Sequence, residues 1–263
     1  FANPIHMMWD SKGRLWVACS WAYPQLKPGE KANDKIIILE DTDDDGKADK
    51  STVFADGLYL PTGIELANGG CYIAQSPDVF FFKDTDGDDV ADVKEVALTG
   101  FGIEDSHHSI SAWRRGPGGW IYFQEGIFLH TQVETQYGVV RNFNGGVYQF
   151  NPRTQKLQMF VRGTGGNPWG HVFDRWGQSF MVNNPRILYL SPASGASSEP
   201  PRLPPLISTE KQCGGDLVTG THLPEELQGQ LLTGRFKSRA IIRYEFIENG
   251  AGFSANVLPP LIS

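Results

Sequence analysis

The chain has 263 residues, a formal net charge of −7 and 40% hydrophobic residues. This apolar content is enough for a sizeable core, in one large all-β domain or two smaller ones. The acidic balance excludes nucleic acid and an anionic membrane surface as the main partner, because both need clustered Lys and Arg. It favours small neutral or cationic ligands. No apolar run approaches the roughly 18 residues of a membrane span, and the start of the chain, Phe1, does not resemble a signal peptide. We expect that processing or trimming has removed any targeting segment.

Short apolar strands, each opened by a glycine, recur along the chain. Their spacings are 56, 50, 58 and 52 residues, and they begin at Gly13, Gly69, Gly119, Gly177 and Gly229. Between them lie second strands rich in β-branched and aromatic residues, such as "KIIILE", "VFFFKD" and "GGVYQFNP". A period of about 50 residues with several strands per unit predicts a β-propeller, because each four-stranded sheet buries its faces only against its neighbours.

The repeat predicts about five visible blades in a single domain over residues 1–263. A sixth repeat would begin near residue 280, at about the same period, so we expect a six-bladed ring that is incomplete at its C-terminus. The Pro- and Ser-rich stretch at residues 191–206 is predicted to be a loop and not a domain boundary. Three widely spaced cysteines, Cys19, Cys71 and Cys213, read as buried strand residues, with a single disulfide left open.

Two acidic stretches have the spacing of calcium loops. Both follow the pattern D-x-D-x-D-x-x-x-D, in which a tight loop turns alternate carboxylates onto one hard cation. The predicted ligands are Asp41, Asp43, Asp45 and Asp49 in the first loop, and Asp84, Asp86, Asp88, Asp92 and Glu95 in the second. The sixth position is Gly46 in the first loop but Asp89 in the second. Strands flank both loops, so we expect structural calcium sites within blades; a solvated acidic hairpin tip is the alternative.

Adjacent histidines, His107 and His108, precede the strand that begins at Gly119. We expect the first strand of each blade to line the central channel, and the loops before those strands to form the face where ligands bind. Further histidines lie at comparable places in the repeat, at His130, His171 and His222. The sequence therefore predicts that several imidazoles converge on the channel. Histidines packed between blades are the alternative.

The segment "HHSISAWRRGPGGWIYFQEG" resembles the H-x₇-G-P-D-G-x-[IL]-Y segment of the PQQ-dependent soluble glucose and aldose sugar dehydrogenases, with Gly118 in place of the Asp. "GGNPWGHVFD" resembles their R-N-P segment, with Gly166 in place of the Arg. "EDTDDDGKADKSTVFADGL", "PTGIELANGG", "GIFLHTQVET" and "NPWGHVFDRWGQS" are similar to a glucose/sorbosone dehydrogenase-like family named as membrane-bound dehydrogenases. This second resemblance covers most of the chain.

The resemblance implies an oxidoreductase acting on a sugar or related alcohol, periplasmic or extracellular, with calcium and PQQ as cofactors and an electron-accepting cytochrome as partner. It places the general base at His108, with His107 beside it, and a neutral imidazole suits proton abstraction near pH 7. The residues expected to contact the cofactor are Asn167, Arg114, Arg162, His171, His130 and Trp169. Arg114 and Arg115 are neighbours on a strand and point to opposite faces, so only one can do so.

Two other functions stay open from the residues alone. The first is a transition-metal site in the channel, because neutral imidazoles are good ligands for copper, zinc or iron. Its candidate ligands are His107, His108, His130, His171 and His222. The second is a non-catalytic carbohydrate-binding or scaffold propeller that uses Trp113, Trp120 and Trp169 as sugar platforms.

Overall fold

The structure is a computed structural model that describes residues 3–164, 166–183, 186–190, 211–250 and 252–263. Its strands form sheets in chain order. The first sheet contains β1 (Pro4–Trp9), β2 (Leu15–Cys19), β3 (Asp34–Glu40) and β4 (Lys50–Leu58). The second contains β5 (Gly63–Ala67), β6 (Gly70–Gln75), β7 (Asp78–Lys83) and β8 (Val93–Thr99). The third contains β9 (Ser111–Arg115), β10 (Ile121–Glu125), β13 (Gly146–Asn151) and β14 (Lys156–Arg162).

The later sheets follow the same plan. The fourth contains β15 (Pro168–Phe173), β16 (Ser179–Asn183) and β17 (Arg186–Leu190). The fifth contains β18 (Gln212–Leu217), β19 (Leu231–Arg235), β20 (Ala240–Asn249) and β21 (Gly252–Ile262). A separate hairpin of β11 (His130–Thr135) and β12 (Gly138–Phe143) is inserted between β10 and β13. Short 3₁₀ turns are η1 (Ser106–His108), η2 (Pro117–Gly119) and η4 (Glu225–Leu227).

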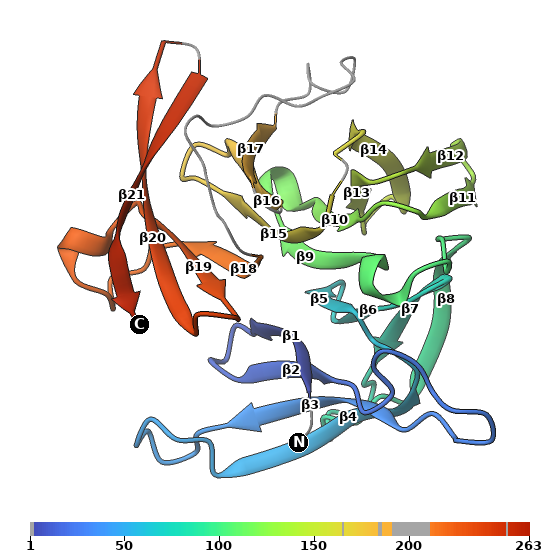
Figure 1. The fold of residues 1–263 in the computed structure, drawn as a ribbon. Coiled ribbons are helices and arrows are strands. Elements are labelled where there is room, and N and C mark those ends of the chain that lie inside the picture. Colours follow the sequence, from blue (N-terminus) through green and yellow to red (C-terminus); the bar gives the residue numbers. More distant parts are fainter. Residues whose placement is uncertain (1–2, 165, 184–185, 191–210, 251) are drawn as a thin grey trace.

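The sheets stand around a common centre, as Figure 1 shows, and the first strand of each sheet is the innermost. Consecutive innermost strands, β1, β5, β9, β15 and β18, contact one another in that order. The chain therefore has an all-β propeller fold, with four four-stranded blades and one three-stranded sheet among the described residues. The six-bladed ring, the single-domain boundary and the incomplete C-terminus remain predictions, and the loop predicted at 191–206 lies outside the described residues.

Apolar side chains fill the layer between each pair of consecutive sheets, as the propeller prediction requires. Ile36 and Ile64 meet between the first and second sheets, and Phe123 packs against the second sheet from the third. Phe180 and Tyr244 lie in the layer between the fourth and fifth sheets. Each sheet thus buries its faces against its neighbours, and the positions of the innermost strands follow from this packing.

The glycine repeat is confirmed, but the strands that it marks are not the ones that line the channel. Each of the five glycine-led strands is the second strand of its sheet, so the channel is lined by the strand before it. All five glycines have left-handed φ values between 74° and 83°, at Gly13, Gly69, Gly119, Gly177 and Gly229. They occupy the turn between the first and second strands, a conformation that costs glycine little and other residues more. The repeated glycine therefore marks the inner hairpin of every blade.

The cysteine prediction is corrected in part. Cys19 and Cys71 are buried strand residues, whereas Cys213 lies exposed on β18, and all three are free thiols. Among the described residues, no helical segment has the length and apolarity needed to cross a membrane.

The inner-hairpin turn gives a first prediction. A Cβ at Gly13 would touch nothing within 4 Å, and the φ of Gly13 is +78°. Gly13→Ala should therefore lower the free energy of unfolding by about 1 kcal/mol through backbone strain alone. Gly220 has equally open space and no left-handed φ, so Gly220→Ala is the matched control and should change stability little. Chemical denaturation measures both, and equal effects would remove the strain argument.

Candidate functional site

A cavity of about 690 Å³ lies at the centre of the ring. Its walls come from the innermost strands β1, β9, β15 and β18, from β19, and from the segment that includes η1. The polar and aromatic lining residues include His6, Tyr23, Thr62, His107, Trp113, Arg114, Trp169, His171, Asp216 and Thr233. A concave site with a few convergent polar groups at the centre of a propeller is where a small ligand is expected to bind.

One carboxylate, that of Asp105, lies beside both members of the histidine pair. Asp105 caps η1, and its Oδ1 accepts a hydrogen bond of 2.8 Å from the backbone N–H of His107. Oδ1 also lies 3.3 Å from Nδ1 of His107, and Oδ2 lies 3.2 Å from Nδ1 of His108. The short turn thus places both Nδ1 atoms near the same carboxylate, although Nδ1 of the buried His108 has no hydrogen-bond partner among the described residues.

The two rings have different surroundings. His108 is buried, and its Nε2 contacts Nδ2 of Asn167. This contact engages Nε2 of His108 within the protein, and His108 is not among the described residues that line the cavity. Burial lowers the pKa of His108, although Asp105 opposes this effect. His107 is half-exposed, lines the cavity and packs edge-on against Tyr23. Of the pair, His107 is the one that lines the cavity.

The arginines of β9 separate as predicted. Arg114 lines the cavity, where its Nε donates to the carbonyl oxygen of His171 at 3.3 Å and its Nη2 lies 3.2 Å from Oδ1 of Asp216. Arg115 points to the other face, where its Nε lies 3.5 Å from Oε1 of the buried Glu65. Burial raises the pKa of Glu65 to about 7. Only Arg114 therefore contributes to the cavity.

Two further histidines of the cavity wall are neutral. Burial lowers the pKa of His171 to about 3, helped by the charge of Arg114, and His171 shares a 2.5 Å hydrogen bond between Nε2 and the Ser179 hydroxyl. Burial also lowers the pKa of His6 to about 4, and its Nε2 donates to the carbonyl oxygen of Trp113 at 3.2 Å. Neither ring carries charge near pH 7, so the lining is close to electrically neutral.

Several predicted site residues lie elsewhere. His130 is on the inserted hairpin, exposed, with Nδ1 3.2 Å from Oε1 of Glu104. Arg162 ends β14, and its guanidinium donates to the carbonyl oxygen of Arg141. His222 is an exposed residue in the segment between β18 and η4. Arg114, Trp169 and His171 line the cavity, whereas Asn167 is not among its described lining residues and contacts His108.

The structure separates the histidines and the tryptophans on which the two alternative functions depend. Among the described residues, no group of three side chains close enough to hold one metal ion includes a histidine. The predicted transition-metal cluster is therefore not formed, because its members belong to separate environments. Trp113 is buried and stacks on Phe123 at 4.4 Å, and Trp120 packs against the core, so neither is an open sugar platform. Trp169 alone of the three remains half-exposed at the cavity.

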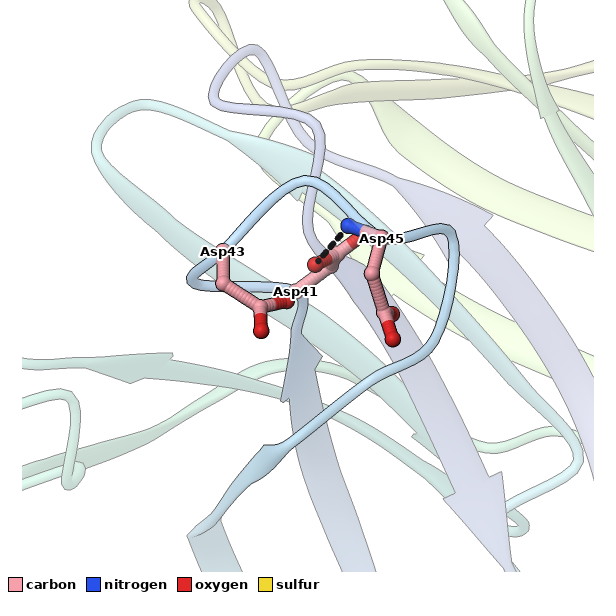
Figure 2. A group of neighbouring side chains, drawn as sticks. All are labelled: Asp41, Asp43 and Asp45. Carbon is pink, nitrogen blue, oxygen red and sulfur yellow. Dashed lines mark hydrogen bonds between the residues drawn. The ribbon is translucent and has the colours of Figure 1, made fainter.

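The acidic loops lie at equivalent places in the first two blades, between the third and fourth strands. Asp41, Asp43 and Asp45 form one group with carboxylate oxygens within 4.8 Å of one another, as drawn in Figure 2. Asp84, Asp86 and Asp88 form the second. The ninth-position residues turn away toward threonines: Asp49 accepts from Thr42, and Asp92 from Thr85. Glu95 pairs with Phe81 across the strands β8 and β7.

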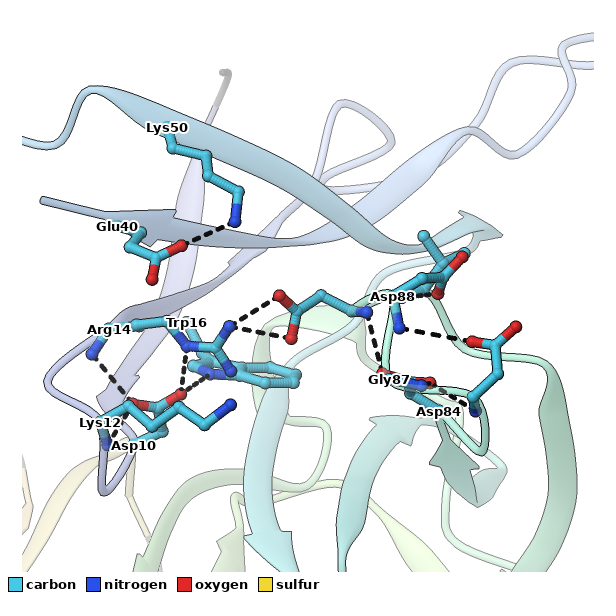
Figure 3. Close-up of polar contacts among 12 residues, drawn as sticks. Asp10, Lys12, Arg14, Trp16, Glu40, Lys50, Asp84, Gly87 and Asp88 are labelled. Atoms are coloured by element: carbon cyan, nitrogen blue, oxygen red, sulfur yellow. Dashed lines mark hydrogen bonds and ion pairs between the residues drawn. The ribbon is translucent and has the colours of Figure 1, made fainter. Parts of the chain in front are cut away.

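The departure at Asp89 has a physical reason. In both loops the fourth and sixth positions are left-handed, as Asp44 and Gly46 in the first and Gly87 and Asp89 in the second. The glycine is therefore at the sixth position of the first loop and at the fourth position of the second, while both positions keep their left-handed backbone conformation in both loops. The Asp89 carboxylate receives two 2.8 Å hydrogen bonds from Nη1 of Arg14, which Asp10 holds in turn (Figure 3). This bridge ties the inner hairpin of the first blade to the acidic loop of the second.

The sequence interpretation missed three residues of the cavity. His6 was not recognised, because it stands on an innermost strand that the glycine repeat does not mark. Tyr23 reaches the cavity from the loop between β2 and β3, and Asp216 from β18. The only available signal for His6 was the shared Asn-Pro that opens both "NPIHMMWD" and "NPWGHVFD". The two strands do not carry their histidines at the same register position. His6 of β1 pairs with Ala18, whereas the residue at the equivalent position of β15 is Gly170, which pairs with Val182.

Comparison with known proteins shows the family. Residues 1–199 match the family described as a domain of unknown function (DUF7133), and the chain belongs to it. No curated protein matches the sequence. The resemblance to the glucose/sorbosone dehydrogenase-like family remains a prediction.

Solved structures with a similar fold are propellers of low sequence identity. A luciferin-regenerating enzyme is 10% identical at a TM-score of 0.64, covering 100% of this chain and 76% of that one. The PQQ domain of pyranose dehydrogenase from Coprinopsis cinerea is 11% identical at a TM-score of 0.60, covering 100% and 80%. A provisionally named oxidoreductase (glucose dehydrogenase) of Thermus thermophilus is 11% identical at a TM-score of 0.57, covering 100% and 84%. At such identities the likeness shows the propeller fold.

The buried His171 predicts an acid-sensitive fold. Its pKa of about 3 lies below the ordinary histidine value of 6.5, so the folded chain binds fewer protons than the unfolded chain between these values. The contribution of neutral His171 to the free energy of unfolding is fully present above pH 6.5. It is lost as the pH falls toward 3, at about 1.4 kcal/mol per pH unit for one proton. His171→Gln should flatten this slope, with the exposed His222→Gln as the control. Denaturation between pH 4 and 7 measures it, and an unchanged slope in His171→Gln would contradict the assignment.

Proposed function

We propose that the protein is an enzyme that binds a neutral sugar or a related alcohol in the central cavity and oxidises it, with His107 as general base. The observation that carries the proposal is the half-exposed His107 ring in the cavity wall, with its Nδ1 3.3 Å from Oδ1 of Asp105. A carboxylate on Nδ1 favours the tautomer whose Nε2 accepts a proton and stabilises the imidazolium that forms. This is the arrangement that removal of a hydroxyl proton requires.

In the proposed step, Nε2 of His107 takes the proton of a substrate hydroxyl. The C–O bond gains double-bond character, and the carbon loses hydride, with its electron pair, to an external quinone or quinone-like dye, which is reduced to the hydroquinone anion and can pass single electrons on to a cytochrome. Arg114 and Asp216, which also line the cavity, offer a donor and an acceptor to other hydroxyls. Oxidation is favoured as the reaction by the resemblance of the His107 segment to sugar dehydrogenases.

The described residues do not fit PQQ. This quinone carries three carboxylates, so its site needs several cations. Of the described residues that line the cavity, Arg114 alone has a permanent positive charge, and Asp216 already pairs with it. Burial keeps His6 and His171 neutral, with pKa values of about 4 and 3. We therefore assign no step to PQQ. The periplasmic or extracellular location and the cytochrome partner belong to the same proposal, and fractionation and a reduction assay with purified cytochrome test them.

Two variants test the base. His107→Ala should lower the rate of dye reduction with neutral aldoses and alditols by about 10²- to 10⁴-fold. The melting temperature should change little, because the ring is half-exposed. His108→Ala instead removes a buried ring that Asn167 contacts. It should cost about 1–3 kcal/mol of stability, since Asn167 loses its partner, and retain more activity than His107→Ala.

The reverse order of activities would move the base to His108, as the resemblance first implied. Hydrolysis of sugar lactones without dye reduction would replace oxidation by hydrolysis at the same cavity. Binding of no sugar, alcohol or lactone by the unmodified chain would contradict the proposal as a whole.

We also propose that each acidic loop binds calcium as a structural ion. Three carboxylates converge in each loop, and the two loops share one backbone path although their glycines are at different positions. Asp41 accepts from the backbone N–H of Gly46 at 2.8 Å, as Asp84 does from Asp89 at 2.8 Å. Oxygen ligands gathered in a tight loop are the donors that calcium prefers.

Chelation should therefore destabilise the protein. Without the cation, like charges remain confined together, and at 100 times the dissociation constant the ion contributes about 2.7 kcal/mol per site. EGTA should lower the melting temperature and added calcium should restore it. Asp43→Asn combined with Asp86→Asn should abolish this response, whereas Asp56→Asn on the exposed surface of β4 should keep it. An unmodified chain that responds to neither EGTA nor calcium would contradict the assignment.

A further inference from the structure

We infer that the ion pair between Arg114 and Asp216 makes the cavity selective for neutral sugars and excludes sugar acids. The inference rests on the proposed function, because it specifies which carbohydrates the same cavity accepts. It concerns a specificity residue, Asp216, that the sequence patterns did not single out.

Arg114 is held in place before any ligand binds. Its Nε donates to the carbonyl oxygen of His171, a buried residue of β15, which fixes the plane of the guanidinium on the wall. Nη2 then meets a single oxygen of Asp216 at 3.2 Å. The guanidinium side chain is 39% exposed and the carboxylate side chain 70% exposed. Both partners are therefore open to a ligand in the cavity.

The pair itself contributes little to stability, because exposed ion pairs are worth about 0–1 kcal/mol. Its effect is on the charge that a ligand meets. A guanidinium fork binds a ligand carboxylate well, but here the Asp216 carboxylate already occupies part of it and repels a second anion. A neutral sugar can donate one hydroxyl to Asp216 and accept from Arg114 with another, and both charges stay compensated.

No other described residue of the lining offsets this repulsion. Arg114 and Asp216 are the only permanently charged side chains among the described lining residues. The Lys211 ammonium lies 6.0 Å from the ring centre of Trp169, but Lys211 is outside the lining. Removing the negative charge of Asp216 should therefore leave Arg114 as an uncompensated, pre-oriented anion receptor.

The experiment compares two probes of the same carbon chain, gluconate and glucitol, by calorimetric or NMR titration. Asp216→Asn should raise the affinity for gluconate by about tenfold or more, the gain expected of a hydrogen bond to a charged group. Its affinity for glucitol should change less. Asp216→Asn combined with Arg114→Gln should lose the gain. Asp56→Asn, the same change of charge on the exposed surface of β4, is the matched control and should bind gluconate as the unmodified chain does.

Three results would overturn the inference: no gain in gluconate affinity for Asp216→Asn, an equal gain for Asp56→Asn, or a gain that persists in the double variant. The proposed function is judged separately, on the binding and oxidation of neutral sugars by the unmodified chain. A chain that takes no neutral sugar but gains gluconate binding on Asp216→Asn would keep the role of the pair and remove the proposed substrate.

Discussion

The contact between Trp113 and Gly63 determines how the centre of the ring is built. The Trp113 indole lies directly against the Gly63 backbone, where any Cβ would overlap the ring, and it also stacks on Phe123 with ring centres 4.4 Å apart. The carbonyl oxygen of Trp113 also accepts from His6 on β1 at 3.2 Å. One residue of β9 thereby holds the innermost strands of three blades together. Because η1 precedes β9 and Arg114 follows Trp113, the candidate base and the cavity arginine are positioned by this packing.

The chemistry of the cavity follows from how few charges the walls retain. Burial keeps His6 and His171 neutral, because it lowers their pKa values to about 4 and 3, and the negative charge of Asp216 compensates the positive charge of Arg114. Against this neutral lining, the Asp105 carboxylate acts on both histidines of η1 while only His107 reaches the cavity. The paired histidines therefore have separate surroundings: His108 is buried against Asn167, and His107 lines the cavity, where we propose that it acts as the base.

The local turn chemistry could be predicted from the sequence, but the convergence of side chains could not. The glycine repeat located the second strand of every blade, because a left-handed turn residue leaves a clear signal. The innermost strands carry no such mark: "PIHMMW" and "SAWRR" have irregular pairing with bulges. The sequence therefore predicts that the second strand of each blade lines the channel, whereas the first strand does so. The sequence also predicts His130 at the channel, for a different reason. The strands β11 and β12 form an inserted hairpin, and the alternation of buried and exposed residues in β11 resembles that of a blade strand. The Arg14 bridge to Asp89 spans 75 positions and leaves no local pattern.

The structure of the protein with a bound neutral aldose would test the proposed site most directly. We expect the sugar in the central cavity, with one hydroxyl oxygen at about 2.6–3.2 Å from Nε2 of His107 and others at Arg114 and Asp216. A sugar bound outside this cavity, or bound within it with no hydroxyl near His107, would contradict the assignment of His107 as the base.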